Sequence, residues 1–257
     1  MDAVVLAAGR GERLRPLTDH KPKALLEIGG TPLVGHVLRR LQRFGVRRAI
    51  INVCWLGAEI QAALGDGSGY GLEIVYSPES PALETAGGIR LALARGLVNS
   101  DPFLVHNADV LSDVDLSQTI LSPGDDARIV LVPNPPEHPR GDYACRGGRV
   151  RPDEENRLTY AGIGFYRQSF FEPWTLESAP LRPLLDKAAR ANRLAGTVHE
   201  GRWWDVGTHR VLAELESDAR AGLLDDLYRS ESAEDRMNGR GGSQLPNEFG
   251  PEIGQHE

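Results

Sequence analysis

The sequence predicts an α/β fold: a Rossmann-like, mixed but mostly parallel sheet flanked by helices, in a single domain. Short apolar runs alternate with amphipathic segments of helical period, which is the pattern of parallel strands joined by crossover helices. A loop rich in glycine and arginine directly follows the first apolar run. The chain has 257 residues, a length that suits one α/β domain with a short appendage.

The first 110 residues carry the clearest alternation of elements. We expect Thr31 to cap the first clear helix, with Pro32 at its first position and Gly45 closing its end. Together these units resemble half of a doubly wound sheet. Apolar runs predict strands at residues 3–7, 49–53, 72–76 and 103–105, and helical periodicity predicts helices at 31–44, 58–64 and 88–94.

The second half is richer in strands. The proline-rich loop at residues 133–139 is excluded from the middle of a sheet, because proline lacks the N–H that a ladder needs. We expect the folded domain to span residues 1–222. Residues 223–257, which are polar and have almost no apolar periodicity, are expected to form a flexible tail. The pattern predicts strands at 127–132, 141–144 and 159–166, and helices at 181–191 and 208–221.

The composition limits the class of partner. The net charge of −7 argues against nucleic acid, and no apolar stretch approaches the ~20 residues that a membrane span needs. The N-terminus has no basic segment before its apolar run, which is unlike a signal peptide. Cys54 and Cys145 form no disulfide framework, and Cys54 is expected to be buried. We therefore expect a cytoplasmic protein with small-molecule partners, while the sequence carries no signal for an oligomeric state.

The strongest motif is the loop after the first predicted strand. It reads Leu6-Ala7-Ala8-Gly9-Arg10-Gly11-Glu12-Arg13-Leu14-Arg15-Pro16-Leu17-Thr18, then Lys21-Pro22-Lys23-Ala24-Leu25-Leu26. Gly9 and Gly11 let backbone N–H groups approach phosphate oxygens, and Arg13, Arg15 and Lys23 add cations suited to a polyphosphate. A glycine turn with surface arginines is the alternative. The order of two glycines, three cations and two prolines favours an anion-binding loop.

Two aspartates far apart in sequence form the second signal. Asp109 follows the apolar run at residues 103–105, and Asp205 lies in the run Trp203-Trp204-Asp205-Val206-Gly207-Thr208. Carboxylates at strand ends that face a phosphate loop are the protein ligands that Mg²⁺ needs, because substrate phosphates and water complete its octahedron. Taken alone, each aspartate also suits a turn or a helix cap. Together with the loop, they favour a magnesium site.

Two further segments carry glycines where a ligand can approach. Glu84-Thr85-Ala86-Gly87-Gly88 precedes a predicted helix, so its amides can meet a ligand and Thr85 can cap the helix. The predicted strand at residues 159–166 contains Tyr160, Gly162 and Gly164. A core strand beside a bulge explains these glycines as well as a binding role does.

At these residues the chain resembles the sugar-phosphate nucleotidyltransferases. Their signature is Leu-Ala-Ala-Gly-x-Gly-x-Arg-x-x-Pro-Leu-Thr followed by Pro-Lys-Pro-Leu, and Ala24 departs from it where the family commonly has proline. The resemblance implies that Arg13 contacts the outgoing pyrophosphate and that Lys23 holds phosphate oxygens at the reacting centre. It also implies that Asp109 and Asp205 hold Mg²⁺. Ala108 replaces the glycine that the family has before the first aspartate, which requires ordinary backbone angles there.

The resemblance also assigns the substrate-binding residues. It implies sugar contacts at Asn107, Tyr160 and Gly162. It implies contacts to the nucleotide and its phosphates at Leu6, Ala7, Ala8, Gly9, Gly11, Glu12, Asn52, Glu84, Thr85, Gly87 and Gly88.

Within the family, four segments resemble the short enzymes that uridylylate N-acetylmuramate α-1-phosphate in peptidoglycan recycling. These segments are residues 52–57, 65–68, 76–79 and 84–85. The resemblance implies UTP and this sugar 1-phosphate as substrates. Guanylyl transfer to mannose 1-phosphate and thymidylyl or uridylyl transfer to glucose 1-phosphate use similar loops and stay open as alternatives.

The mechanistic hypothesis is in-line attack of a sugar-phosphate oxygen on the α-phosphorus of the nucleotide, which needs positioning and charge neutralisation rather than a general base. A dinucleotide oxidoreductase is the main rival. It is disfavoured because Leu14 stands where Gly-x-Gly-x-x-Gly requires its third glycine. A non-catalytic nucleotide-sugar sensor is the other alternative. It is disfavoured because a pure binder does not need the carboxylates of a metal site.

Overall fold

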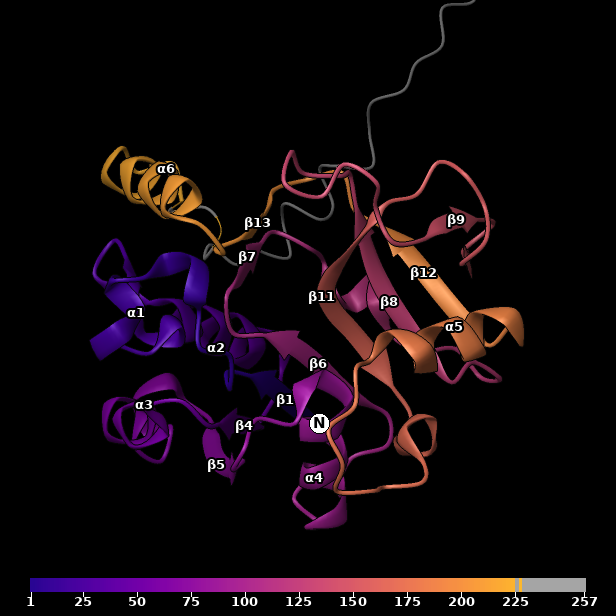
Figure 1. The fold of residues 1–257 in the computed structure, drawn as a ribbon, viewed down its shortest axis with the longest axis horizontal. Helices are drawn as coiled ribbons and strands as arrows, with labels where there is room; N and C mark the ends of the chain where they lie inside the picture. The colour runs from indigo at the N-terminus through magenta and orange to yellow at the C-terminus, as the bar shows by residue number, and fades with distance from the viewer. Residues whose placement is uncertain (225–226, 228–257) are drawn as a thin grey trace, which may run out of the picture.

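The computed structural model describes residues 1–224 and 227, and a nine-stranded sheet runs through them (Figure 1). The strand order is β5-β4-β1-β6-β11-β8-β12-β10-β9. β11 and β10 run opposite to the other strands of this sheet, so the predicted mixed, mostly parallel sheet is confirmed. The strands are β1 (Asp2–Leu6), β4 (Arg48–Val53), β5 (Glu73–Pro78), β6 (Phe103–Asn107), β8 (Ala127–Val132), β9 (Ala144–Arg146), β10 (Arg149–Arg151), β11 (Thr159–Tyr166) and β12 (Leu194–Val198).

Helices cover both faces of the sheet, and two small antiparallel pairs lie beside it. The pairs are β2 (Glu27–Ile28) with β3 (Thr31–Pro32), and β7 (Val110–Ser112) with β13 (Trp203–Asp205). The helices are α1 (Leu17–His20), α2 (Leu33–Phe44), α3 (Gly57–Leu64), α4 (Glu84–Ala94), α5 (Arg182–Arg190) and α6 (His209–Arg220).

The register of three parallel strands brings predicted site residues into one row. β1 pairs in parallel with β4 on one side and with β6 on the other. In these ladders Leu6 lies opposite both Asn52 and Asn107. The carboxyl ends of the three strands therefore meet at one edge of the sheet, which is where open α/β sheets bind their ligands.

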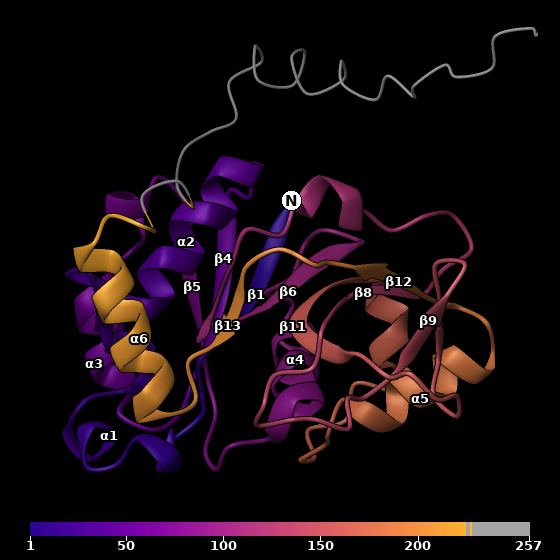
Figure 2. The same cartoon turned by 90° about the horizontal axis from the view of Figure 1, so that it is seen from above.

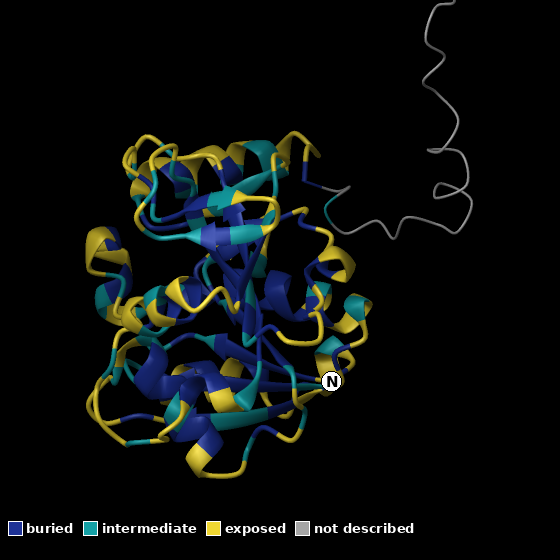
Figure 3. Ribbon diagram, turned by 90° about the vertical axis from the view of Figure 1, so that its right-hand side faces the viewer, coloured by how far each residue is buried: buried dark blue, intermediate teal, exposed yellow. Residues whose placement is uncertain are grey.

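The strands at the centre are buried on both faces (Figure 3). In β1, Ala3 and Val5 pack into one core with α2 and α3, while Val4 packs into a second core with α4 and α5. This period of two is why the strand reads as a continuous apolar run. A third apolar cluster lies under α6, which joins the N-terminal half of the molecule, whereas α5 lies at the other end of the sheet (Figures 1 and 2).

The predicted start of the first long helix is wrong. Thr31 and Pro32 belong to β3, which pairs with β2, and α2 begins at Leu33 without a side-chain cap. Gly29 and Gly30 have φ values of 56° and 73° and form the two-residue turn between the strands, which is a strong hairpin signal. Thr31 is therefore held by strand pairing rather than by a helix terminus. The predicted end of α2 is confirmed, because Gly45 is its left-handed C-cap.

Other elements differ mainly at their boundaries. α4 starts at Glu84 rather than residue 88, and the strand predicted at residues 141–144 lies instead at Ala144–Arg146. The sequence pattern did not predict β7, β10, β12 or β13. Most of the predicted tail lies outside the described residues. The side chains of Leu224 and Leu227 pack against the cluster under α6.

Among residues 1–224 and 227, no helix combines the length and apolar character that crossing a bilayer requires.

Candidate active site

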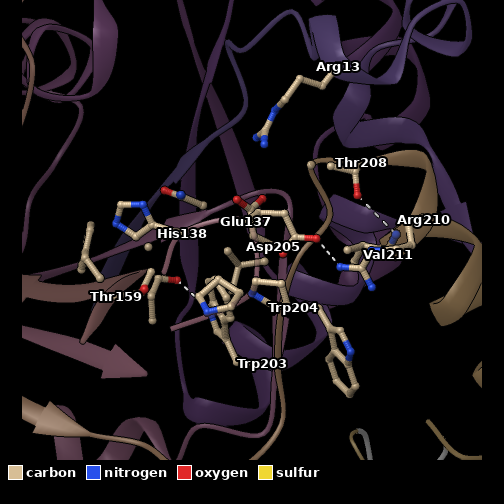
Figure 4. Close-up of a pocket in the computed structure, with 18 of the residues that line it drawn as sticks. Arg13, Glu137, His138, Thr159, Trp203, Trp204, Asp205, Thr208, Arg210 and Val211 are labelled. Atoms are coloured by element: carbon tan, nitrogen blue, oxygen red, sulfur yellow. Dashed lines mark hydrogen bonds and ion pairs between the residues drawn. The ribbon is translucent and has the colours of Figure 1, made fainter. Parts of the chain in front are cut away.

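Three adjoining hollows open at the carboxyl edge of β1, β4 and β6. The first has a volume of about 540 Å³ and lies between α6, β13, β11 and the loop at residues 133–139 (Figure 4). The second, of about 240 Å³, lies beside the glycine loop and the start of α4. The third, of about 410 Å³, lies between α4, β11 and α5. Asn107 lines all three, so this residue marks the point where they meet.

The loop after β1 is shaped by Gly11. Its φ of 71° is left-handed, and a Cβ atom there would lie 3.0 Å from the Cβ of Lys23. Only glycine meets both conditions without strain. The hydroxyl of Thr18 donates to the Gly11 carbonyl at 2.9 Å, and the indole N–H of Trp55 donates to the Thr18 carbonyl at 3.1 Å. The loop therefore holds Lys23 against its inner side.

The start of the same loop is held by a buried polar network. The Ala7 N–H donates to Asn52 Oδ1 at 2.6 Å, and Asn52 Nδ2 donates to Glu79 Oε1 at 2.7 Å. The second oxygen of Glu79 accepts from the Leu83 N–H at 2.9 Å. Asn52 and Glu79 are 3% and 5% exposed. Both polar atoms of the Asn52 side chain therefore hydrogen-bond within the protein and hold the loop. The residue also lines the second hollow.

Asp109 and Asp205 converge, as the sequence predicts. β13 pairs with β7 so that Asp205 lies opposite Val110, and the Val206 N–H donates to the Asp109 carbonyl at 3.0 Å. Lys23 forms an ion pair with Asp109, and its Nζ lies 3.8 Å from Asp205 Oδ1. Both carboxylates therefore reach a single cationic centre beside the glycine loop.

Crowding of negative charge affects Asp205 in particular. Its withdrawal from water within the cleft and the nearby charge of Asp109 raise the pKa of Asp205, against the opposing charges of Lys23 and Arg13. Because 45% of this side chain is still exposed, the raised pKa reflects a cleft carboxylate rather than a core one. Like charges held this close favour the binding of a further cation.

The two carboxylates suit a divalent ion that substrates also coordinate. In the described part of the chain, no three His, Cys, Asp or Glu side chains form a group that could hold a metal on their own. An ion shared by Asp109 and Asp205 would complete its coordination with substrate phosphate and water, as Mg²⁺ commonly does. The donor set fits this ion and does not resemble a closed protein site.

Arg13 lies across the cleft from Asp205 and Glu137 (Figure 4). A Cβ atom on Gly207 would lie 2.6 Å from a guanidinium nitrogen of Arg13, so the side chain lies directly against that glycine. The charge of Arg13 also helps to lower the pKa of Glu137, although the Arg210 guanidinium contributes most to that shift. The exposed Arg13 side chain is therefore available to an anionic ligand in this cleft.

The predicted sugar residues lie at a bulge in β11. The ladder with β8 shifts register between Tyr160 and Gly164, and Gly162 has a φ of 73°. A Cβ atom at Gly162 would lie 2.5 Å from Asn107 Nδ2. The Tyr160 hydroxyl lies 2.9 Å from the Tyr166 hydroxyl, and burial raises the pKa of Tyr160 to about 12. The bulge that the sequence offered as one explanation of these glycines is therefore present, and Gly162 leaves room for the Asn107 side chain.

These features match a known family. A family model described as nucleotidyl transferase matches residues 2–222. The chain belongs to the nucleotidyl transferase family. The resemblance predicted from the sequence is confirmed.

Relatives of this nucleotidyl transferase agree with the assignment. A Neisseria meningitidis serogroup B protein named N-acetylmuramate alpha-1-phosphate uridylyltransferase is 47% identical over 231 residues, covering 86% of this chain and 99% of that protein. A Caulobacter vibrioides protein of the same name is 33% identical and covers 85% and 96%. The solved inositol-1-phosphate CTP transferase of T. maritima aligns with a TM-score of 0.69 at 21% identity, covering 86% and 96% of the two chains, which shows a shared fold.

In this transferase, the start of α4 differs from the sequence-based expectation. Ala86 and Gly87 donate their N–H groups to the Ala179 carbonyl at 2.9 and 3.1 Å, so these amides are not free for a ligand. Thr85 lies inside the helix and does not cap it. Glu84 adopts a φ of 59°, a strained value for a residue with a side chain, at the edge of the second and third hollows.

The two glycines of this segment serve packing. A Cβ atom on Gly88 would lie 2.3 Å from Glu79 Oε1 and 2.7 Å from Asn52 Nδ2, and one on Gly87 would lie 2.8 Å from the Glu177 carbonyl. Gly88 lets α4 approach the buried network behind the second hollow, and Gly87 lets it approach the backbone at residues 177–179. The hollow itself is lined by Leu6, Ala8, Gly9, Asn52, Glu79, Ala82, Glu84, Thr85, Asn107 and Asp109.

Several residues of the transferase site were not singled out from the sequence. Glu79 lies in the segment 76–79 that carries part of the resemblance, but the resemblance assigned it no role; its place just after β5, at the carboxyl edge of the sheet, is the signal that points to one. Asp142 and Arg210 line the first hollow but lie in segments without a motif. Cys54, expected to be buried, is half-buried, and burial raises the pKa of its thiol.

Proposed function

We propose that this nucleotidyl transferase transfers a uridylyl group from UTP to N-acetylmuramate α-1-phosphate and releases pyrophosphate, with Mg²⁺ as cofactor. The convergence of Asp109 and Asp205 on one cationic centre beside the Gly11 loop carries the proposal. The choice of substrates is supported by the two relatives that bear this activity in their names.

The reaction joins two anions by an in-line displacement. A non-bridging oxygen of the sugar phosphate attacks the α-phosphorus of UTP, and the bond from that phosphorus to the oxygen bridging to the β-phosphate breaks. The electron pair leaves with pyrophosphate. The attacking phosphate is already ionised at neutral pH, so the step needs no general base and depends on positioning and charge neutralisation.

In this scheme each cation of the cleft neutralises a different phosphate charge. Arg13, which lies against Gly207, stabilises the charge that develops on pyrophosphate. The aliphatic part of the Lys23 side chain packs against Gly11 of the loop. When the nucleotide binds, the Lys23 ammonium leaves its ion pair with Asp109 and contacts an α-phosphate oxygen instead. Asp109 and Asp205 would hold Mg²⁺, which would supply neutralisation of phosphate charge.

The three hollows suggest a place for each substrate part. The second hollow, beside Gly9 and Thr85, accommodates the nucleoside. Asn107, Tyr160 and Gly162 face the sugar where the hollows meet. The free thiols of Cys54 and Cys145 suit a reducing compartment, and we propose that the enzyme acts in the cytoplasm.

The test is a matrix of UTP, GTP, CTP, dTTP and ATP against several sugar 1-phosphates, with pyrophosphate release as the readout. We expect the highest kcat/KM for UTP with N-acetylmuramate α-1-phosphate, loss of activity on chelation and recovery with Mg²⁺. A higher kcat/KM for GTP with mannose 1-phosphate would replace the proposal by guanylyl transfer. Tight nucleotide binding without pyrophosphate release from any pair would instead indicate a sensor.

A further inference from the structure

The third hollow contains one arginine whose guanidinium is only loosely paired. Arg182, the first residue of α5, lies with its guanidinium 5.6 Å from the centre of the Tyr143 ring. Its nearest carboxylate oxygen is on Asp142, at 3.5 Å. The Arg182 side chain is 53% exposed, and both it and Asn107 line the hollow. A half-exposed cation therefore faces the space next to the point where the three hollows meet.

Tyr143 lies beside this arginine and is itself held in place. The tyrosine is 2% exposed, and its hydroxyl donates to Asp186 Oδ1 at 2.9 Å. Asp186 lies one turn along α5 from Arg182, so the buried ring is bonded to the same helix that carries the arginine. A cation–π contact with a fixed ring favours one side of the guanidinium's range while leaving its N–H groups available to a ligand.

The carboxylate of Asp142 is already shared. Its Oδ2 accepts from the Tyr160 N–H at 2.9 Å, and its Oδ1 lies 3.2 Å from His138 Nε2. The contact to Arg182 is the longest of the three. Asp142 is thus held by the backbone of β11, and Arg182 can accept a better anionic partner without leaving this carboxylate unsatisfied.

The other cations around the first hollow have closer partners or another role. Arg210 pairs with Glu137 and, at 2.6 Å, with Glu214. Arg13 faces Asp205 and the proposed pyrophosphate site. Arg182 is therefore the cation of the third hollow best placed to meet a carboxylate carried by the sugar.

We propose that Arg182 binds the lactyl carboxylate of the sugar substrate and so selects N-acetylmuramate over N-acetylglucosamine. N-acetylmuramate differs from N-acetylglucosamine by a lactyl ether on C3, which adds one carboxylate. This inference rests on the proposed function. With the sugar at Asn107 and Tyr160, the substituent extends into the third hollow, where the guanidinium supplies a charge-assisted hydrogen bond.

The experiment compares Arg182→Gln with the unchanged enzyme on two sugars. We expect Arg182→Gln to lower kcat/KM for N-acetylmuramate α-1-phosphate by roughly 10- to 100-fold, the range of one charged hydrogen bond. The same constant for N-acetylglucosamine 1-phosphate and the KM for UTP should stay within about twofold. Arg190→Gln is the matched control, because Arg190 ends the same helix, is 59% exposed and lines none of the hollows.

A binding measurement isolates the charge. Calorimetric titration of both sugar 1-phosphates, and of the muramate derivative whose lactyl carboxylate is converted to an amide, does not require turnover. The unchanged protein should bind the acid more tightly than the amide, and Arg182→Gln should bind the two equally. Equal losses on both sugars, or undiminished preference for the acid in the variant, overturn the role of Arg182. Absence of uridylyl transfer by the unchanged enzyme, with muramate binding and acid preference intact, overturns the proposed function alone.

Discussion

Lys23 Nζ forms an ion pair with Asp109 and at the same time lies 3.8 Å from Asp205 Oδ1. One lysine thus bridges two carboxylates that are separated by almost a hundred residues in the sequence. The bridge depends on the pairing of β13 with β7, which sets Asp205 opposite Val110. The arrangement leaves one net negative charge at a place that faces the glycine loop.

The first prediction concerns this trio. Asp109→Asn or Lys23→Ala should reduce turnover at least ~10³-fold, because each removes a charge that the displacement needs at the reacting centre. Pyrophosphate release measures the loss, and the thermal midpoint should change little. Asp115→Asn, at an exposed aspartate that caps a short 3-10 turn, is the control and should keep full activity. Near-normal turnover in either site variant would refute the role assigned to it.

The second prediction uses two glycines with the same backbone angle. Gly162 and Gly30 both have a φ of 73°, but a Cβ atom at Gly162 would lie 2.5 Å from Asn107 Nδ2, whereas nothing lies within 4 Å of one at Gly30. Alanine at either site should cost about 1–2 kcal/mol in stability from the left-handed backbone. Only Gly162→Ala should also raise the KM for the sugar 1-phosphate, by roughly tenfold, since it displaces Asn107. Equal KM values in the two variants would contradict this.

The sequence pattern predicted those elements whose structure depends on consecutive residues alone. The apolar run of β1 and the glycines of the following loop are readable because burial on two faces and left-handed turns leave a mark on consecutive residues. The pairing of Asp109 with Asp205 was expected from the family signature. Its structural cause, the three-residue strands β7 and β13, was not predicted, because each gains its register from a partner far along the chain.

Tertiary contacts account for the other differences. Thr31 has the side chain of a helix cap, but the turn at Gly29 and Gly30 pairs it with Ile28. Thr85 was expected to cap α4, but the Ala179 carbonyl takes the first amides of that helix. At both threonines the observed structure depends on a contact with residues outside the short sequence pattern from which a helix cap was predicted.

The third prediction tests the buried network behind the glycine loop. Glu79→Gln replaces one carboxylate oxygen by an NH₂ group that must face Asn52 Nδ2 or the Leu83 N–H, both of which are donors. We expect a loss of about 1–3 kcal/mol in the free energy of unfolding, because a buried donor is left unpaired. When the new NH₂ group faces Asn52, the Asn52 amide turns its oxygen toward it and no longer accepts from the Ala7 N–H. The glycine loop then loses its anchor, and the KM for UTP should rise. Urea titration and initial rates measure the two effects.

Glu73→Gln, at the start of β5, the strand that Glu79 follows, is the control, because Glu73 is exposed. A Glu79→Gln protein with the stability and the KM for UTP of the control would show that the network does not position the loop.

The fourth prediction concerns pH and His106, which is 1% exposed in β6. Burial, with a smaller contribution from the charge of Arg40, lowers its pKa from 6.5 to about 4, against a hydrogen bond to the Asn107 carbonyl and the charge of Asp109. Between these two pH values the unfolded chain binds a proton that the folded chain does not. The free energy of unfolding should therefore fall as the pH drops from 6.5 towards 4, by about 3 kcal/mol in total, and be unaffected by this group above 6.5.

Urea titrations of the unchanged protein and of His106→Gln, from pH 7.5 to pH 4.5, measure this contribution. Asp205, whose pKa is raised, contributes with the opposite sign, so the difference between the two proteins is the quantity that isolates His106. The variant should lose less stability than the unchanged protein over this range, because glutamine does not titrate. His20→Gln, at an exposed histidine of α1, is the control variant. Parallel curves for His106→Gln and the unchanged protein would mean that His106 is protonated in the folded state as readily as in the unfolded chain.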